Sequence, residues 1–105
     1  MPSRWTILIA AATCFLLCAR IPTLALFGKL DDNIVATKNR DAWESALRAG
    51  GKRDYTLRIL PKANHLQLEA KTGSNAEMAS LQRFVPAYIP TITDWLAAHI
   101  RSFRP

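Results

Sequence analysis

The sequence is poor in the residues that build disulfide-rich or metal-binding proteins. Its 105 residues include only two cysteines, Cys14 and Cys18, and both lie inside an apolar stretch. Two cysteines this close together do not form a disulfide framework, and no histidine or acidic residue nearby completes a metal site. No internal repeat or low-complexity tract is present either. We therefore predict no metal and no cofactor, and interpret both cysteines as small apolar residues.

Acidic residues are also scarce, with 8 Asp and Glu against 14 Lys and Arg, which gives a formal net charge of +6. A basic chain can attract nucleic acid or anionic lipid weakly. Here the basic residues form no long run and have little aromatic interleaving, so we favour a solvated surface of mixed charge and predict no nucleic-acid partner. Six of the 14 basic residues show this scatter: Lys38, Arg40, Arg48, Lys52, Arg53 and Arg58.

The length and hydrophobic content allow at most one small domain, and they exclude intrinsic disorder because half of the residues are hydrophobic. Residues 1–20 form a separate apolar segment with a short basic start, an apolar stretch over residues 5–19, and Arg20. This plan is typical of a secretory signal, although no good Ala-x-Ala cleavage site comes after it. The apolar length falls short of the roughly 18 residues of a membrane span.

Three interpretations of residues 1–20 therefore stay open: a signal or membrane anchor, a buried element of a larger α/β protein, or a start created by truncation. The first makes the protein exported or membrane-associated through residues 5–19. The others are compatible with a cytoplasmic protein.

The central part of the sequence alternates between strand-like and helix-like patterns. Residues 23–27 are apolar without alternation, which is typical of a parallel strand covered on both faces. Residues 36–49 have a helical pattern that ends at Gly50-Gly51. Residues 55–60 form a second strand-like run. We predict the α/β fold class, built on a βαβ unit with two parallel strands.

An acid and a histidine come after these two strands. Gly28 closes the first strand and Asp31-Asp32 come next, while His65 lies just beyond the second strand. Parallel strands end at the same edge of a sheet, so we expect Asp31 and His65 to lie close together there. An acid beside an imidazole is half of a charge-relay triad.

The last third of the chain predicts a loop over residues 66–75, a short helix over about residues 76–83, and a final helix started by Thr91 or Thr93. The final helix carries a continuous apolar stripe and is predicted to lie across the sheet. We interpret Trp43 as a core anchor, like Trp95, and His99 as a packing residue. The stripe consists of Ile92, Trp95, Leu96, His99, Ile100 and Phe103.

Two strands and two or three helices cannot cover both faces and both edges of a sheet. Hydrophobic burial contributes roughly 25 cal/mol per Å² only where an apolar face has a partner, and the chain supplies few partners. The pattern is that of the end of a larger doubly wound domain.

Three stretches, residues 21–31, 54–56 and 60–65, resemble the C-terminal part of an α/β-hydrolase. The resemblance is closest to the esterase and prolyl-oligopeptidase-like serine hydrolases, and it extends over about residues 21–100. It implies that residues 21–105 form a βαβα portion of that fold. It also implies that Asp31, at the end of the Gly-x-x-Asp turn, is the triad acid and that His65 is the base, with Asp32 as the alternative acid.

The nucleophile motif of that family, Gly-x-Ser-x-Gly, is absent from the 105 residues, as is the loop that forms its oxyanion hole. The family's order is serine, acid, histidine, so we expect the missing half before Met1. The chain would then be an inactive fragment of a serine hydrolase, acting on a small ester or acyl substrate only when completed. The alternative is a small exported or membrane-attached module, derived from a hydrolase, with a non-catalytic binding or structural role. The serines are Ser3, Ser45, Ser74, Ser80 and Ser102.

Overall fold

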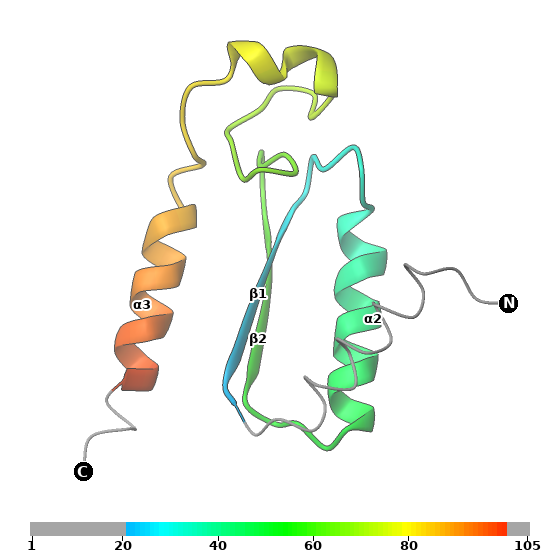
Figure 1. Cartoon of the computed structure of the whole chain (residues 1–105), viewed down its shortest axis with the longest axis vertical. Helices are drawn as coiled ribbons and strands as arrows, with labels where there is room; N and C mark the ends of the chain where they lie inside the picture. The colour runs from blue at the N-terminus through cyan, green and yellow to red at the C-terminus, as the bar shows by residue number, and fades with distance from the viewer. Residues whose placement is uncertain (1–20, 101–105) are drawn as a thin grey trace, which may run out of the picture.

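The computed structural model describes residues 21–100 as two strands, two α-helices and a short 3₁₀ helix (Figure 1). The predicted signal or anchor in residues 5–19 lies outside the described residues, as do residues 101–105. The elements are β1 (Thr23–Gly28), α2 (Ala36–Ala49), β2 (Tyr55–Leu60), η1 (Asn75–Ser80) and α3 (Tyr88–Ile100).

The two strands pair in parallel, as the βαβ pattern predicted. Thr23 lies opposite Tyr55 at one end of the pair, and Gly28 lies opposite Leu60 at the other. The register has no offset at the carboxyl end, so both strands finish side by side and the segments after them start from the same edge. The chain therefore has mixed helix and strand content with a parallel two-stranded sheet, which is compatible with the α/β class.

Helix α2 has the predicted bounds. Its C-cap is Gly50, whose N–H donates to the Ala46 carbonyl, and Gly51 comes next with a φ of +75° that favours glycine. Leu47 is buried on the side facing the sheet, and α2 contacts both strands. Arg40 and Arg48 both form ion pairs with Glu44 on the helix surface.

The core lies at the carboxyl end of the sheet. Leu60, Ala63 and Val85 are buried together, and Leu26 and Tyr88 pack against them. Most of the remaining strand residues are only half-buried, because no third strand pairs with β1 or β2 within residues 21–100. The best-packed part of the described chain is therefore the part directly beneath the segments that leave the two strands.

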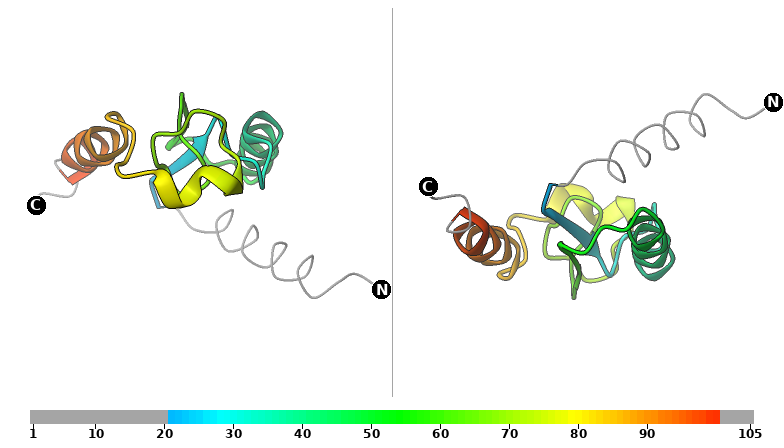
Figure 2. Two further views of the ribbon diagram at one scale, coloured as in Figure 1. Left: turned by 90° about the horizontal axis from the view of Figure 1, so that it is seen from above. Right: turned by 90° about the horizontal axis from the view of Figure 1, so that it is seen from below.

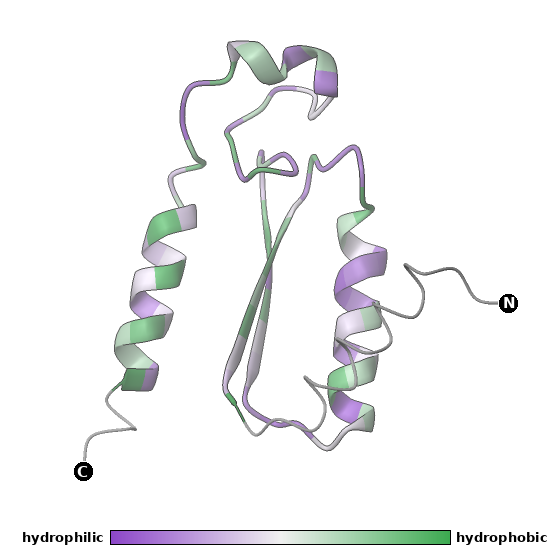
Figure 3. Cartoon of the chain, viewed as in Figure 1, coloured by the Kyte–Doolittle hydropathy of each residue, from purple (hydrophilic) through white to green (hydrophobic). Residues whose placement is uncertain are grey.

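Helix α3 differs from its prediction at its start and in its burial. It begins at Tyr88, and the Thr91 and Thr93 hydroxyls donate back to the carbonyls of Ala87 and Pro90 instead of capping the helix. None of its residues is buried, although Figure 3 shows apolar residues along much of its length. Figures 1 and 2 place α3 and α2 on opposite sides of the sheet. The helix was predicted to lie across the sheet, but α3 has little contact with either strand, so this prediction was wrong for the described residues.

Three smaller predictions also need correction. The short helix predicted over residues 76–83 is a 3₁₀ helix that ends at Ser80, with the Ser74 side chain accepting from the Ala76 N–H at its start. Trp43 and Trp95 were predicted to be core anchors, but both are only half-buried.

His99 is an ion-pair residue as well as a packing residue, so its prediction was incomplete. Its ring stacks on Trp95 with 4.0 Å between ring centroids. Its Nδ1 lies 2.8 Å from the Trp95 carbonyl oxygen, and its Nε2 lies 3.1 Å from the Asp54 carboxylate. Both acceptors are satisfied only when both ring nitrogens carry hydrogen, which is the protonated imidazolium. The contact ties the end of α3 to the start of β2.

This ion pair predicts that stability falls as pH rises. The carbonyl of Trp95 and then the carboxylate of Asp54 raise the pKa of His99 above 6.5, against the opposing effect of partial burial. A raised folded-state pKa contributes stability that is complete below the unfolded pKa and is lost as pH rises through the folded value. We expect the melting temperature to decrease as pH rises above 6.5, and Asp54→Asn to reduce that decrease. The exposed Asp32→Asn is the matched control; a pH profile unchanged by Asp54→Asn would contradict the contact.

Candidate functional site

The site begins with the turn after β1, residues 29–34, here named the acid turn. One carboxylate oxygen of Asp31, Oδ1, accepts hydrogen bonds from the backbone N–H groups of Asn33 at 2.8 Å and Ile34 at 3.0 Å. Aspartate commonly closes turns in this way, because its short side chain reaches the backbone two and three residues on. The second oxygen, Oδ2, is thereby held in a fixed direction.

The other half of the site is the histidine loop, residues 61–70, which comes directly after β2. The sequence predicted a loop over residues 66–75, and the structure adds that the chain doubles back as a hairpin in which Ala63 pairs with Glu69 in antiparallel fashion. A turn closes it, with the Gln67 N–H donating to the Asn64 carbonyl at 3.0 Å. Gln67 has a φ of +65°, which is typical of the residue after such a turn. His65 therefore occupies a central turn position.

Backbone hydrogen bonds join the acid turn to the end of β2 and to the histidine loop. The N–H of Lys29 donates to the Leu60 carbonyl at 3.0 Å, and the N–H of Leu30 donates to the Ala63 carbonyl at 2.9 Å. Gly28 makes this approach possible, because a Cβ at this position would lie 2.3 Å from the Asn64 carbonyl oxygen. The glycine was predicted to allow a turn; the structure shows that it also allows close backbone contact.

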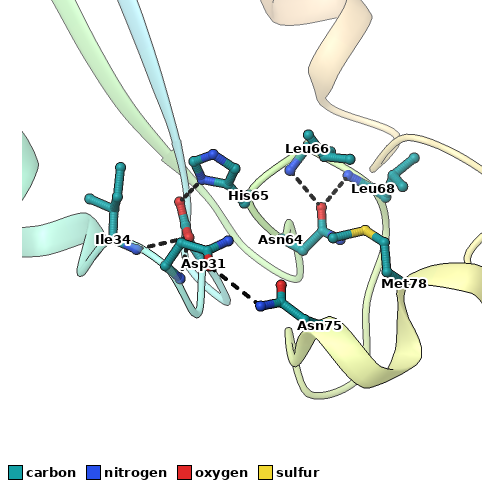
Figure 4. Close-up of polar contacts among 9 residues, drawn as sticks. Asp31, Ile34, Asn64, His65, Leu66, Leu68, Asn75 and Met78 are labelled. Carbon is teal, nitrogen blue, oxygen red and sulfur yellow. Dashed lines mark hydrogen bonds and ion pairs between the residues drawn. The ribbon is translucent and has the colours of Figure 1, made fainter.

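Asp31 and His65 meet across this contact, 34 residues apart in the chain (Figure 4). Asp31 Oδ2 lies 2.8 Å from His65 Nδ1. The Asp31 side chain is 10% exposed and that of His65 is 43% exposed, so the acid is shielded and the imidazole is accessible. Figure 4 shows the second ring nitrogen pointing away from Asp31, toward the outside of the pair.

The ionisation of Asp31 fixes the tautomer of His65. Burial alone would raise the pKa of Asp31, but the hydrogen bond with His65 and the two backbone N–H groups outweigh it and lower the pKa below 3.8. An ionised carboxylate only accepts hydrogen bonds, so Nδ1 must carry the hydrogen. In the neutral imidazole the lone pair is then on the accessible Nε2, where it can accept a proton.

The structure separates the two candidate acids and adds a residue that the sequence analysis missed. Asp31 is bonded to His65, whereas the neighbouring Asp32 is exposed to solvent. Asn64, next to His65, is fully buried and bonded to the histidine loop. The sequence did contain a signal for this role of Asn64: an asparagine side chain at the start of a turn commonly accepts a hydrogen bond from the backbone two residues on.

Two clefts flank the site without including Asp31 or His65. One, of about 580 Å³, lies between the sheet and α3 and includes Leu60 and Trp95 in its lining. The other, of about 690 Å³, lies between the histidine loop and η1 and includes Lys62 and Glu77. Both reach elements next to the pair, but the accessible Nε2 of His65 is outside them.

Neither a metal site nor a membrane span is found in the part of the chain that the structure describes. Residues 21–100 contain no cluster of three or more His, Cys, Asp or Glu side chains placed to hold a metal ion. No described helix combines the length and the apolar character needed to cross a membrane. Comparisons with protein-family models, curated proteins and solved structures found no match to this chain.

The close contact at Gly28 predicts that adding a methyl group at this position, as in Gly28→Ala, will push the histidine loop away from the acid turn. In Gly28→Ala the added Cβ would meet backbone oxygens of both Asn64 and Ala63, at 2.3 Å and 2.6 Å, so the histidine loop must move. We expect a loss of about 1–3 kcal/mol in the free energy of unfolding. We also expect loss of the Asp31–His65 hydrogen bond, measured by the NMR signal of the Nδ1 hydrogen.

Gly51→Ala is the matched control. It also introduces strain, at a φ of +75°, but its Cβ meets no atom within 4 Å. It should cost about 1–2 kcal/mol and leave the His65 signal unchanged. Retention of that signal in Gly28→Ala would refute the role assigned to the contact.

Proposed function

We propose that this chain supplies the acid and the base of a serine-hydrolase catalytic triad, as the C-terminal part of an α/β-hydrolase fold. The observation that supports the proposal is the 2.8 Å contact between Asp31 Oδ2 and His65 Nδ1. The contact lies beyond the carboxyl ends of two parallel strands, where α/β proteins hold their functional groups. The reaction is hydrolysis of a carboxylic ester or a related acyl compound.

Each member of the pair has a defined part in that reaction. Nε2 of His65 removes the proton from a serine hydroxyl as the serine oxygen attacks the acyl carbon, and the same proton then goes to the departing alcohol. Water then attacks the acyl-serine ester, giving a proton to Nε2, which returns it to the serine oxygen as the carboxylic acid leaves. Asp31 stays ionised, holds the Nδ1–H tautomer and stabilises the imidazolium that forms. The local hydrogen bonds from Asn33 and Ile34 keep the carboxylate in place while the imidazole changes charge.

The serine nucleophile belongs to a different polypeptide segment. Two described serines are already bonded within η1 and its cap: Ser74 accepts from the Ala76 N–H, and Ser80 donates to the Glu77 carbonyl. Ser45 is exposed on α2. None of the five serines in the sequence has the flanking glycines of a nucleophile elbow. The substrate pocket would also be completed by that other segment.

The proposal predicts that the chain alone is inactive. The purified protein should not be labelled by a fluorophosphonate and should not hydrolyse p-nitrophenyl acetate above the rate of free imidazole at the same concentration. A burst of p-nitrophenol that disappears in His65→Ala would show that the chain holds its own nucleophile, and it would overturn this part of the proposal.

The decisive test is to sequence the DNA upstream of the Met1 codon and translate all frames. We expect a Gly-x-Ser-x-Gly motif after an apolar strand within about 250 codons, the upper size of most domains. Expressed together with this chain, that segment should become reactive toward fluorophosphonates. Asp31→Asn should then lower kcat by about 10⁴-fold, because the amide oxygen stays with the Asn33 and Ile34 N–H groups and an NH₂ donor faces Nδ1, which selects the wrong tautomer, while Asp32→Asn should have little effect.

Absence of any such motif would count against the hydrolase proposal. It would favour the alternative of a non-catalytic binding or structural module.

A further inference from the structure

Asn64 is the polar side chain most completely enclosed by the histidine loop. Its exposed fraction is 0%, whereas the side chain of the neighbouring His65 is 43% exposed. A buried amide costs free energy unless its oxygen and nitrogen both find partners. The two adjacent residues therefore have opposite environments: the Asn64 side chain is enclosed by protein, and the His65 ring is accessible to solvent.

The amide oxygen of Asn64 closes the turn that carries His65. Oδ1 accepts the backbone N–H of Leu66 at 2.9 Å and that of Leu68 at 3.0 Å. These two donors lie on the far side of His65 in the chain, so a single oxygen holds both limbs of the hairpin. The backbone of Asn64 also donates to the Leu68 carbonyl, at 3.0 Å.

The amide nitrogen of Asn64 connects the histidine loop to η1. Nδ2 donates to the Met78 sulfur at 3.2 Å (Figure 4). A second, longer contact of 3.5 Å from Asn75 to Asn33 links η1 to the acid turn. The 3₁₀ helix therefore reaches both halves of the site, and Asn64 is its attachment to the histidine half.

We infer that Asn64 is a positioning residue that directs the His65 imidazole onto Asp31. The buried amide fixes the backbone on both sides of His65, which restricts where the exposed ring can lie. Its importance for catalysis rests on the proposed hydrolase function, but its effect on the ring does not. Without the amide oxygen, the Leu66 and Leu68 N–H groups lose their partner, the hairpin loosens, and Nδ1 leaves Oδ2.

The test monitors the Nδ1–H proton resonance of His65 and its nitrogen shifts by NMR in the full chain. Asn64→Ala should lose this resonance and move His65 toward the tautomer mixture of free imidazole. Asn64→Asp should restore it, because burial favours the protonated carboxyl, which keeps an acceptor oxygen for both N–H groups and an O–H donor for the Met78 sulfur. Ser80→Ala is the control on η1, because the Ser80 hydroxyl donates to the Glu77 carbonyl within the same 3₁₀ helix, and it should leave the resonance in place.

A purely structural role would lower the melting temperature of Asn64→Ala and leave the His65 signal of the folded protein unchanged. That outcome would overturn the inference. If Asn64→Ala does not fold, amide hydrogen exchange in the unsubstituted protein decides the question. Slow exchange at both Leu66 and Leu68 supports the inference, and fast exchange at either one overturns it.

These readouts do not depend on hydrolysis. A missing upstream serine segment would refute the proposed function and leave the NMR result standing. An unchanged His65 signal would refute the role of Asn64 without affecting the triad proposal.

Discussion

The candidate site depends on the backbone contact between the acid turn and the histidine loop. Two hydrogen bonds, from Lys29 to Leu60 and from Leu30 to Ala63, continue the pairing of the strands past the end of the sheet. Because the strands finish in register, the two segments leave the same edge and can form these bonds at once. Gly28 is required there since the opposing backbone leaves no room for a Cβ. The Asp31–His65 pair is a consequence of that contact.

Buried apolar residues are concentrated next to the histidine loop, so the candidate site lies on the best-packed part of the described chain. The buried cluster of Leu60, Ala63 and Val85 lies beneath the histidine loop, while much of the sheet and all of α3 are at best half-buried. The loop is thus anchored through its own Ala63, which packs against Leu60 and Val85, and through the hydrogen bonds of Asn64. At the opposite end, one ion pair between His99 and Asp54 ties α3 to β2. Segments with few buried contacts open more readily, so we expect α3 to be the more mobile element.

Apolar periodicity and chain order were sufficient to predict the regular elements at the centre of the fold. The bounds of α2, both strands, their parallel pairing and the approach of Asp31 to His65 could all be derived from that periodicity and the rule for βαβ units. Details set by tertiary contact were out of reach. The His99–Asp54 pair joins residues 45 positions apart, so no local pattern encodes it. The start of α3 at Tyr88 and the hairpin around His65 use hydrogen bonds between near neighbours in the chain, and the apolar periodicity did not reveal them. The role of Asn64 was missed although the sequence contained a signal for it, namely the preference of asparagine for the start of a turn.

The most direct test of the Asp31–His65 pair is the tautomer of His65, measured by long-range ¹H–¹⁵N correlation near pH 8 in the unsubstituted chain, Asp31→Asn and Asp32→Asn. We predict the Nδ1–H form in the unsubstituted chain and in Asp32→Asn, because an ionised Asp31 accepts that hydrogen. Asp31→Asn should lose this preference. An Nε2–H form in the unsubstituted chain, or the same spectrum in all three proteins, would contradict the claim that Asp31 fixes the tautomer and orientation of the His65 imidazole.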